Sequence, residues 1–102
     1  MGCILEAIDY DDLFTLQMLG NEAERRIFLE LQKKEMSGYD LIDKTKFPQT
    51  TVYRKIKHLQ KDGLVFPVRE RRISHEVFYD VLYSRIQIDV QNGEIEITYT
   101  PK

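Results

Sequence analysis

One stretch of seventeen residues, FPQTTVYRKIKHLQKDG at positions 47–63, constrains the fold more than any other part of the chain. Its apolar residues recur at helical spacing, at Val52, Ile56 and Leu59. Pro48 is tolerated in a first helical turn, where its missing N–H would have no intrahelical partner, and Gly63 suits a helix stop. The pattern predicts a helix over 48–62 that is entered through a sharp turn.

The remaining faces of this helix mix cations that can meet phosphates with amide and hydroxyl groups that can reach base edges. They carry Gln49, Thr50, Tyr53, Arg54, Lys55, Lys57, His58 and Lys61. Such a set is typical of a DNA-recognition helix. An ordinary amphipathic helix with a solvated basic face explains the stretch equally well by itself, so the neighbouring elements must decide between the two.

Length and composition predict a single globular domain over 1–102 with one modest core. We find no apolar run long enough to span a membrane and no signal-peptide pattern, so we expect a cytoplasmic protein. The lone cysteine, Cys3, cannot form an internal disulfide, which fits a reducing compartment. We expect no metal and no cofactor, because His58 and His75 lie apart and the chain has no metal-ligand spacing.

The net charge of −2 conceals an uneven distribution. Residues 44–75 hold nine Lys/Arg against two Asp/Glu, a net charge of +7, whereas 1–43 and 76–102 carry −6 and −3. Because salt screens charges beyond about 8–10 Å, a basic segment can attract phosphate although the whole protein is mildly acidic.

Three helices are expected before the basic one. An aspartate among Asp9, Asp11 and Asp12 begins the first, although 3–8 is ambiguous between helix and strand. The second starts at Asn21 and runs to about Lys34, with Ala23, Ile27, Phe28 and Leu31 inward and Glu24, Arg25, Lys33 and Lys34 outward. The third starts at Gly38 behind Ser37, buries Leu41 and ends near Lys46. A short turn then leads to the basic helix, which makes a helix-turn-helix.

After Gly63 the apolar period changes from that of a helix to that of a strand. We predict strands over 64–68 and 77–83 joined by a basic loop, RERRISHE at 69–76. A hairpin that follows a recognition helix is a wing, and its arginines can reach the DNA backbone or the minor groove, at Arg69, Arg71 and Arg72. The alternative is a solvated loop that only prevents aggregation.

A second hairpin is predicted over 85–100. Asn92-Gly93 favours a type I′ turn and pairs Val90 with Ile95, Ile88 with Ile97 and Ile86 with Tyr99. All six apolar side chains then share one face, which a lone ribbon cannot leave in water. We expect either the N-terminal aliphatic stretch or, slightly favoured, a second subunit to cover it.

Several segments together resemble the winged helix-turn-helix transcription regulators, in particular small ArsR-like regulators and their archaeal and archaeal-virus relatives. The resemblance covers residues 13–83, the expected core. It is carried by Leu19-Gly20-Asn21, Arg25-Arg26-Ile27, and Leu59 with Asp62-Gly63-Leu64-Val65. It implies an α+β winged-helix fold in which five residues of the basic helix face the major groove, Gln49, Thr50, Tyr53, Arg54 and Lys57, and in which Arg69, Arg71 and Arg72 belong to the wing.

Two departures from that family limit what the resemblance implies. Metal-sensing ArsR proteins carry cysteine pairs or Asp/His ligand pairs that this chain lacks, so metal sensing is not expected. Those proteins also dimerise largely through terminal helices, whereas this chain ends in a hairpin, so their mode of dimerisation does not transfer.

The sequence therefore predicts a sequence-specific regulator that binds double-stranded DNA as a homodimer. Its predicted DNA-binding residues are Gln49, Thr50, Tyr53, Arg54, Lys57, Lys61, Arg69, Arg71 and Arg72. The alternative function is a winged-helix module that binds another protein. We find no phosphate loop, zinc motif or nucleophile turn, so we expect no enzyme activity.

Overall fold

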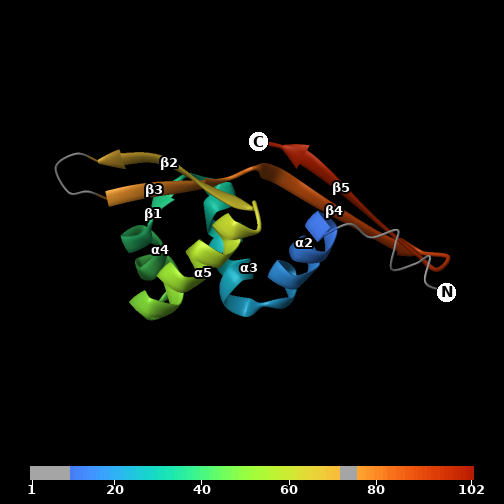
Figure 1. The fold of residues 1–102 in the computed structure, drawn as a ribbon, viewed down its shortest axis with the longest axis horizontal. Coiled ribbons are helices and arrows are strands. Elements are labelled where there is room, and N and C mark those ends of the chain that lie inside the picture. The colour runs from blue at the N-terminus through green and yellow to red at the C-terminus, as the bar shows by residue number, and fades with distance from the viewer. Residues whose placement is uncertain (1–9, 72–75) are drawn as a thin grey trace.

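The computed structural model describes residues 10–71 and 76–102. Within these residues, four helices, with one short strand between the second and the third, are followed by two hairpins (Figure 1). In chain order the elements are α2 (Tyr10–Gly20), α3 (Glu22–Lys33), β1 (Met36–Ser37), α4 (Gly38–Thr45), α5 (Gln49–Lys61), β2 (Val65–Arg71), β3 (Glu76–Val81), β4 (Tyr83–Gln91) and β5 (Glu94–Pro101). The predicted α+β class and the order of helices and hairpins are confirmed.

Side-chain caps begin two of the helices where the sequence predicts them. Asn21 Oδ1 accepts a hydrogen bond from the Glu24 N–H at the start of α3, at 3.0 Å. Ser37 and Asp40 form a reciprocal capping box at the start of α4. Each cap satisfies backbone donors that have no partner inside the helix, so these boundaries depend on local sequence.

A strand that the sequence did not predict lies between α3 and α4. β1 contains only Met36 and Ser37, which are buried and pair antiparallel with Tyr79 and Phe78 of β3. Two residues are too few to show a strand period, so only the tertiary pairing reveals this strand. It completes a three-stranded sheet in the order β1-β3-β2.

The core lies between α2, α3, α4, α5 and that sheet. Its apolar members are Met18, Ile27, Phe28, Leu31, Met36, Leu41, Val52, Ile56, Leu59, Leu64, Val65, Phe78 and Val81. The inward faces predicted for α3 and α5 are confirmed, except that Ala23 is only half-buried. The prediction that Glu24 points outward is wrong, because Glu24 is 4% exposed.

The bounds of the wing strands differ from the prediction: β2 is longer, and β3 ends at Val81 and not at residue 83. β2 extends to Arg71 and β3 begins at Glu76, so half of the expected loop 69–76 belongs to paired strands, at Arg69, Glu70, Arg71 and Glu76. Pro67 lies on the outer strand of the sheet, where its missing N–H costs no internal hydrogen bond. The register shifts between Pro67 and Arg69, and such a bulge hides the strand period from sequence analysis.

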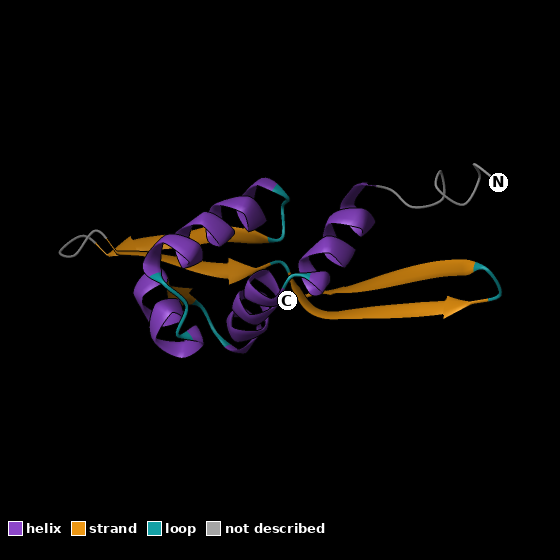
Figure 2. Cartoon of the chain, turned by 90° about the horizontal axis from the view of Figure 1, so that it is seen from below, coloured by secondary structure: helices purple, strands orange, loops and turns teal. Residues whose placement is uncertain are grey.

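The C-terminal hairpin has the predicted register. Val90 pairs with Ile95, and the next two apolar pairs follow in step. Asn92 and Gly93 both have positive φ, 53° and 77°, as a type I′ turn requires. The two hairpins project from the helical core in opposite directions (Figures 1 and 2).

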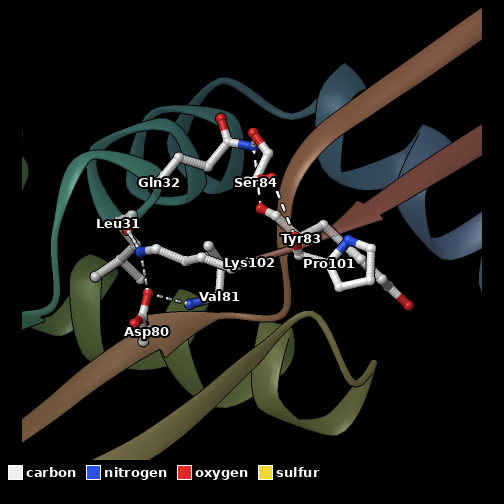
Figure 3. Close-up of polar contacts among 8 residues, drawn as sticks. All are labelled: Leu31, Gln32, Asp80, Val81, Tyr83, Ser84, Pro101 and Lys102. Atoms are coloured by element: carbon white, nitrogen blue, oxygen red, sulfur yellow. Dashed lines mark hydrogen bonds and ion pairs between the residues drawn. The ribbon is translucent and has the colours of Figure 1, made fainter.

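Polar contacts attach the base of this hairpin to the core (Figure 3). Lys102 Nζ donates to the Leu31 carbonyl at 3.1 Å and pairs with Asp80 at 2.5 Å. Gln32 Nε2 donates to the carbonyl groups of Tyr83 and Ser84, both at 3.3 Å. These bonds join α3 to the point where β3 passes into β4.

Tyr99 makes a further attachment, to the first turns of α2. Its hydroxyl donates to Asp12 Oδ1 at 2.7 Å and lies 3.0 Å from Oγ1 of the fully buried Thr15. Burial raises the pKa of Tyr99 to about 12, and the Asp12 carboxylate acts in the same direction. The hydroxyl therefore remains a donor at neutral pH.

Beyond this base the apolar face is open. Val90 is 69% exposed, and Ile95 and Ile88 are 40% and 38% exposed. Of the two predicted covers for this face, the N-terminal aliphatic stretch, 3–19, contributes the contact of α2 with Tyr99, and its residues 3–9 lie outside the described residues. A second subunit as the cover stays a prediction. The face therefore offers apolar surface to a partner.

The substitution Tyr99→Phe tests how the hairpin is attached. We expect the free energy of unfolding to fall by about 1–2 kcal/mol, because a hydrogen bond to a charged acceptor is lost. Urea denaturation measures the change. Tyr83→Phe is the control, since it keeps the ring contact between Tyr83 and Tyr99, whose centroids lie 4.6 Å apart. Equal stability of the two variants would contradict the anchoring role.

Candidate nucleic-acid interface

The solvent face of α5 carries one continuous stripe of polar side chains. Thr50, Arg54, Lys57 and Lys61 follow at intervals of four, three and four residues, so they lie on one side of the helix. All four are exposed, whereas Val52, Ile56 and Leu59 on the other side are at most 1% exposed. We call these four residues the outward stripe. Gln49, the first residue of α5, is also exposed.

Tyr53 lies at the margin of this stripe and packs against the start of α4. A Cβ atom at Gly38 would lie 2.6 Å from the Tyr53 ring, so only glycine leaves room for the ring in this position. Tyr53 is still 36% exposed. Partial burial raises its pKa, with contributions from nearby Tyr39, Tyr79 and Glu76. Tyr53 therefore fixes α5 against α4 and the wing in addition to facing solvent.

The other flank of α5 is paired with α3. Glu24 Oε1 lies 2.9 Å from His58 Nδ1, and Glu24 Oε2 lies 3.3 Å from Lys55 Nζ. Lys55 and His58 therefore differ from the cations of the outward stripe, because both contact the buried carboxylate of Glu24. Sequence periodicity could not show this, since it depends on how α3 crosses α5.

The turn before α5 is held by the polar group of Thr45. Thr45 is 2% exposed, and its Oγ1 donates to the Leu41 carbonyl at 2.7 Å and accepts from the Phe47 N–H at 3.4 Å. The Arg26 guanidinium stacks over the Phe47 ring at 4.8 Å. These contacts set the angle between α4 and α5.

Two exposed cations at the end of α4 and in the turn after it were not among the predicted binding residues. Lys44 is exposed on α4, and Lys46 is exposed in the left-handed conformation, with φ 63°. Lys44 lies in the last turn of α4 and Lys46 directly after α4, and Lys46 forms an exposed ion pair with Asp43 at 3.3 Å. The sequence does indicate a role for them, because both belong to the segment 44–75, whose net charge is +7.

The wing carries the remaining predicted residues. Arg69 and Arg71 lie in β2, where their backbones pair with Phe78 and Glu76 of β3. Arg72 lies outside the described residues. The wing and the N-terminal end of α5 are at the same end of the molecule (Figures 1 and 2), which is the arrangement that a shared ligand would need.

Other kinds of site are not evident in the parts of the chain that the structure describes. Within 10–71 and 76–102, no three His, Cys, Asp or Glu residues gather where they could hold a metal ion. Among the same residues, no helix has the length and apolar character to cross a membrane.

The order α4, turn, α5, then the β2–β3 hairpin packed on the same core, is that of a winged helix-turn-helix. The fold therefore places the chain among winged-helix architectures. Neither a protein-family model nor a curated protein sequence matches it.

Solved structures of winged-helix transcriptional regulators are similar to this chain. Reduced HlyU from Vibrio cholerae N16961 is 25% identical, with a TM-score of 0.65 over 76% of this chain and 78% of HlyU. The transcriptional regulator HlyU from Vibrio vulnificus CMCP6 is 26% identical, with a TM-score of 0.60 over 68% of this chain and 69% of that protein. NolR from Sinorhizobium fredii is 21% identical, with a TM-score of 0.60 over 70% and 68%, and supports the fold alone. Among them, HlyU from Vibrio vulnificus is a transcriptional regulator, which is not an enzyme. The resemblance to archaeal and archaeal-virus relatives stays a prediction.

The substitution Gly38→Ala tests the contact between α4 and Tyr53. We expect it to lower the free energy of unfolding by about 1–3 kcal/mol, because the added methyl group displaces the ring. Chemical denaturation measures the cost. Gly20→Ala is the matched control, since open space surrounds Gly20 at the end of α2 and alanine favours a helix there. If both variants are as stable as the wild type, the ring moves aside without cost and the contact does not fix α5.

Proposed function

We propose that this protein is a sequence-specific transcriptional regulator of the ArsR-like kind that binds double-stranded DNA as a homodimer in the cytoplasm. Helix 48–62 lies in the major groove, and the wing, 69–76, contacts the backbone or the minor groove. The outward stripe is the observation that carries this proposal. Its hydroxyl and cationic groups point into solvent on one face of α5, where a single DNA duplex can contact all of them.

The charge distribution supports the same function. The stripe belongs to the segment 44–75, which has a net charge of +7 within a chain of net charge −2. A local field of this sign steers phosphate towards α5, and acidic segments elsewhere limit the overall affinity. The similarity in fold to HlyU, a transcriptional regulator in Vibrio vulnificus, is consistent with this function.

A second candidate function is a winged-helix module that binds another protein. The exposed apolar face of the C-terminal hairpin favours it, because such a face fits a protein partner as well as a second copy. DNA affinity without a linear dependence on the logarithm of salt concentration would favour this alternative.

The double variant Arg54→Ala/Lys57→Ala tests the DNA-binding face. We expect the slope of log affinity against log salt to decrease in magnitude by about 1.8, since each lost phosphate contact contributes about 0.9. If either side chain contacts a guanine, discrimination at one base position also falls by about 1–3 kcal/mol. Fluorescence anisotropy with duplex DNA at several salt concentrations measures both effects.

The matched control is Lys33→Ala/Lys34→Ala, which removes two exposed cations at the end of α3. It changes the net charge equally but leaves α5 intact. We expect a much smaller change in the salt slope. Identical slopes for the two double variants would reject α5 as the binding element.

The substitution Val90→Lys tests whether the C-terminal hairpin forms the dimer. Val90 is 69% exposed in a single chain, so the change should leave the fold intact. In a dimer that uses this face, the substitution would bury an unpaired charge. We therefore expect the dissociation constant of the dimer to increase at least about tenfold. Sedimentation velocity measures the association. Gln87→Lys, on the polar face of β4, is the control. A variant that dimerises as well as this control would place the dimer interface elsewhere.

A further inference from the structure

A buried carboxylate connects the scaffold helix α3 with the proposed recognition helix α5. The side chain of Glu24 is 6% exposed. One of its oxygens pairs with Lys55 Nζ at 3.3 Å, and the other lies 2.9 Å from His58 Nδ1. His58 Nε2 also lies 3.6 Å from Asp62 Oδ2, whose side chain is 8% exposed. We call these four residues the Glu24 network.

The Glu24 network holds two basic residues of α5, Lys55 and His58, against the protein, whereas the cations of the outward stripe face solvent. A buried charge is costly unless it is paired, so the Glu24 carboxylate strongly favours keeping Lys55 beside it. The Lys55 side chain is accordingly only 21% exposed, although lysine can usually extend into water. A phosphate that approached this flank would also meet the negative charge of Glu24.

The network also restricts rotation of α5 about its own axis. Lys55, His58 and Asp62 are spaced by three and four residues, so they lie along one flank of the helix. Two of them contact the same fixed carboxylate on α3. Rotation of α5 would break these contacts and would turn the outward stripe away from its present direction.

We propose that Glu24 is a positioning residue that sets DNA specificity, an inference that rests on the proposed function. It withholds Lys55 from the phosphate backbone and fixes the direction of the outward stripe. The protein thereby has weaker sequence-independent binding and stronger discrimination between sequences. Glu24 itself does not touch DNA.

The substitution Glu24→Gln provides the test, because it removes the charge and keeps the shape. With its partner neutral, Lys55 can swing out to a phosphate. We expect affinity for a random duplex to rise about three- to tenfold and the salt slope to steepen by about 0.9. The preference for a duplex selected from a random pool over a random duplex should fall several-fold. Fluorescence anisotropy measures all three quantities.

Glu22→Gln is the matched control, since it removes the same charge from an exposed position in the first turn of α3. Equal changes in salt slope for Glu22→Gln and Glu24→Gln would overturn the proposal. The double variant Glu24→Gln/Lys55→Met should return the slope to the wild-type value, because the released cation is gone. A slope that stays steep would show that Lys55 is not its source.

Lys55→Met alone keeps the proposal testable if Glu24→Gln fails to fold. We expect this variant to bind DNA with the wild-type salt slope, since Lys55 makes no phosphate contact in the wild type. A slope reduced by about 0.9 would overturn the proposal. Wild-type protein without salt-dependent DNA affinity would reject the proposed function and this role together, whereas unchanged behaviour of Glu24→Gln rejects only the role of Glu24.

Discussion

The packing of α5 against α3 determines where every candidate binding side chain of the helix lies. Val52, Ile56 and Leu59 are almost completely buried in the core that α3 shares with α5, so the opposite side of α5 must face solvent. Apolar burial alone is non-directional and tolerates some rotation of a helix. The paired charges of Glu24 and the ring of Tyr53 against Gly38 add the directional contacts that remove this freedom.

The two hairpins divide the molecule into two ends with different chemistry. At one end lie the far ends of β2 and β3 together with the N-terminal end of the basic helix α5 (Figure 1). The other end presents an apolar strand face that the core covers only at its base, through contacts such as that between Tyr99 and Asp12. Because the ends are separate, a partner on the apolar face would leave the basic end free for a second ligand.

Local sequence was sufficient for much of this structure. The caps at Asn21 and Ser37, the stop at Gly63 and the turn at Asn92-Gly93 each depend on a few neighbouring residues, so the sequence alone predicted them. The apolar period of α5 likewise predicted which side is buried, and hence which polar residues are exposed. The DNA-binding role of the whole predicted set, on α5 as well as on the wing, stays a prediction.

Contacts between distant segments decided the remainder. β1 exists only because β3 lies beside it, and the ends of β2 and β3 depend on their pairing. Glu24 has the spacing of the buried residues Ile27, Phe28 and Leu31, and the crossing of α3 and α5 brings it next to Lys55 and His58. Sequence alone thus determined the helix-turn-helix and the hairpin register, since these depend on short-range periodicity. Only the tertiary structure determined which cations are free, because pairing depends on which helices meet.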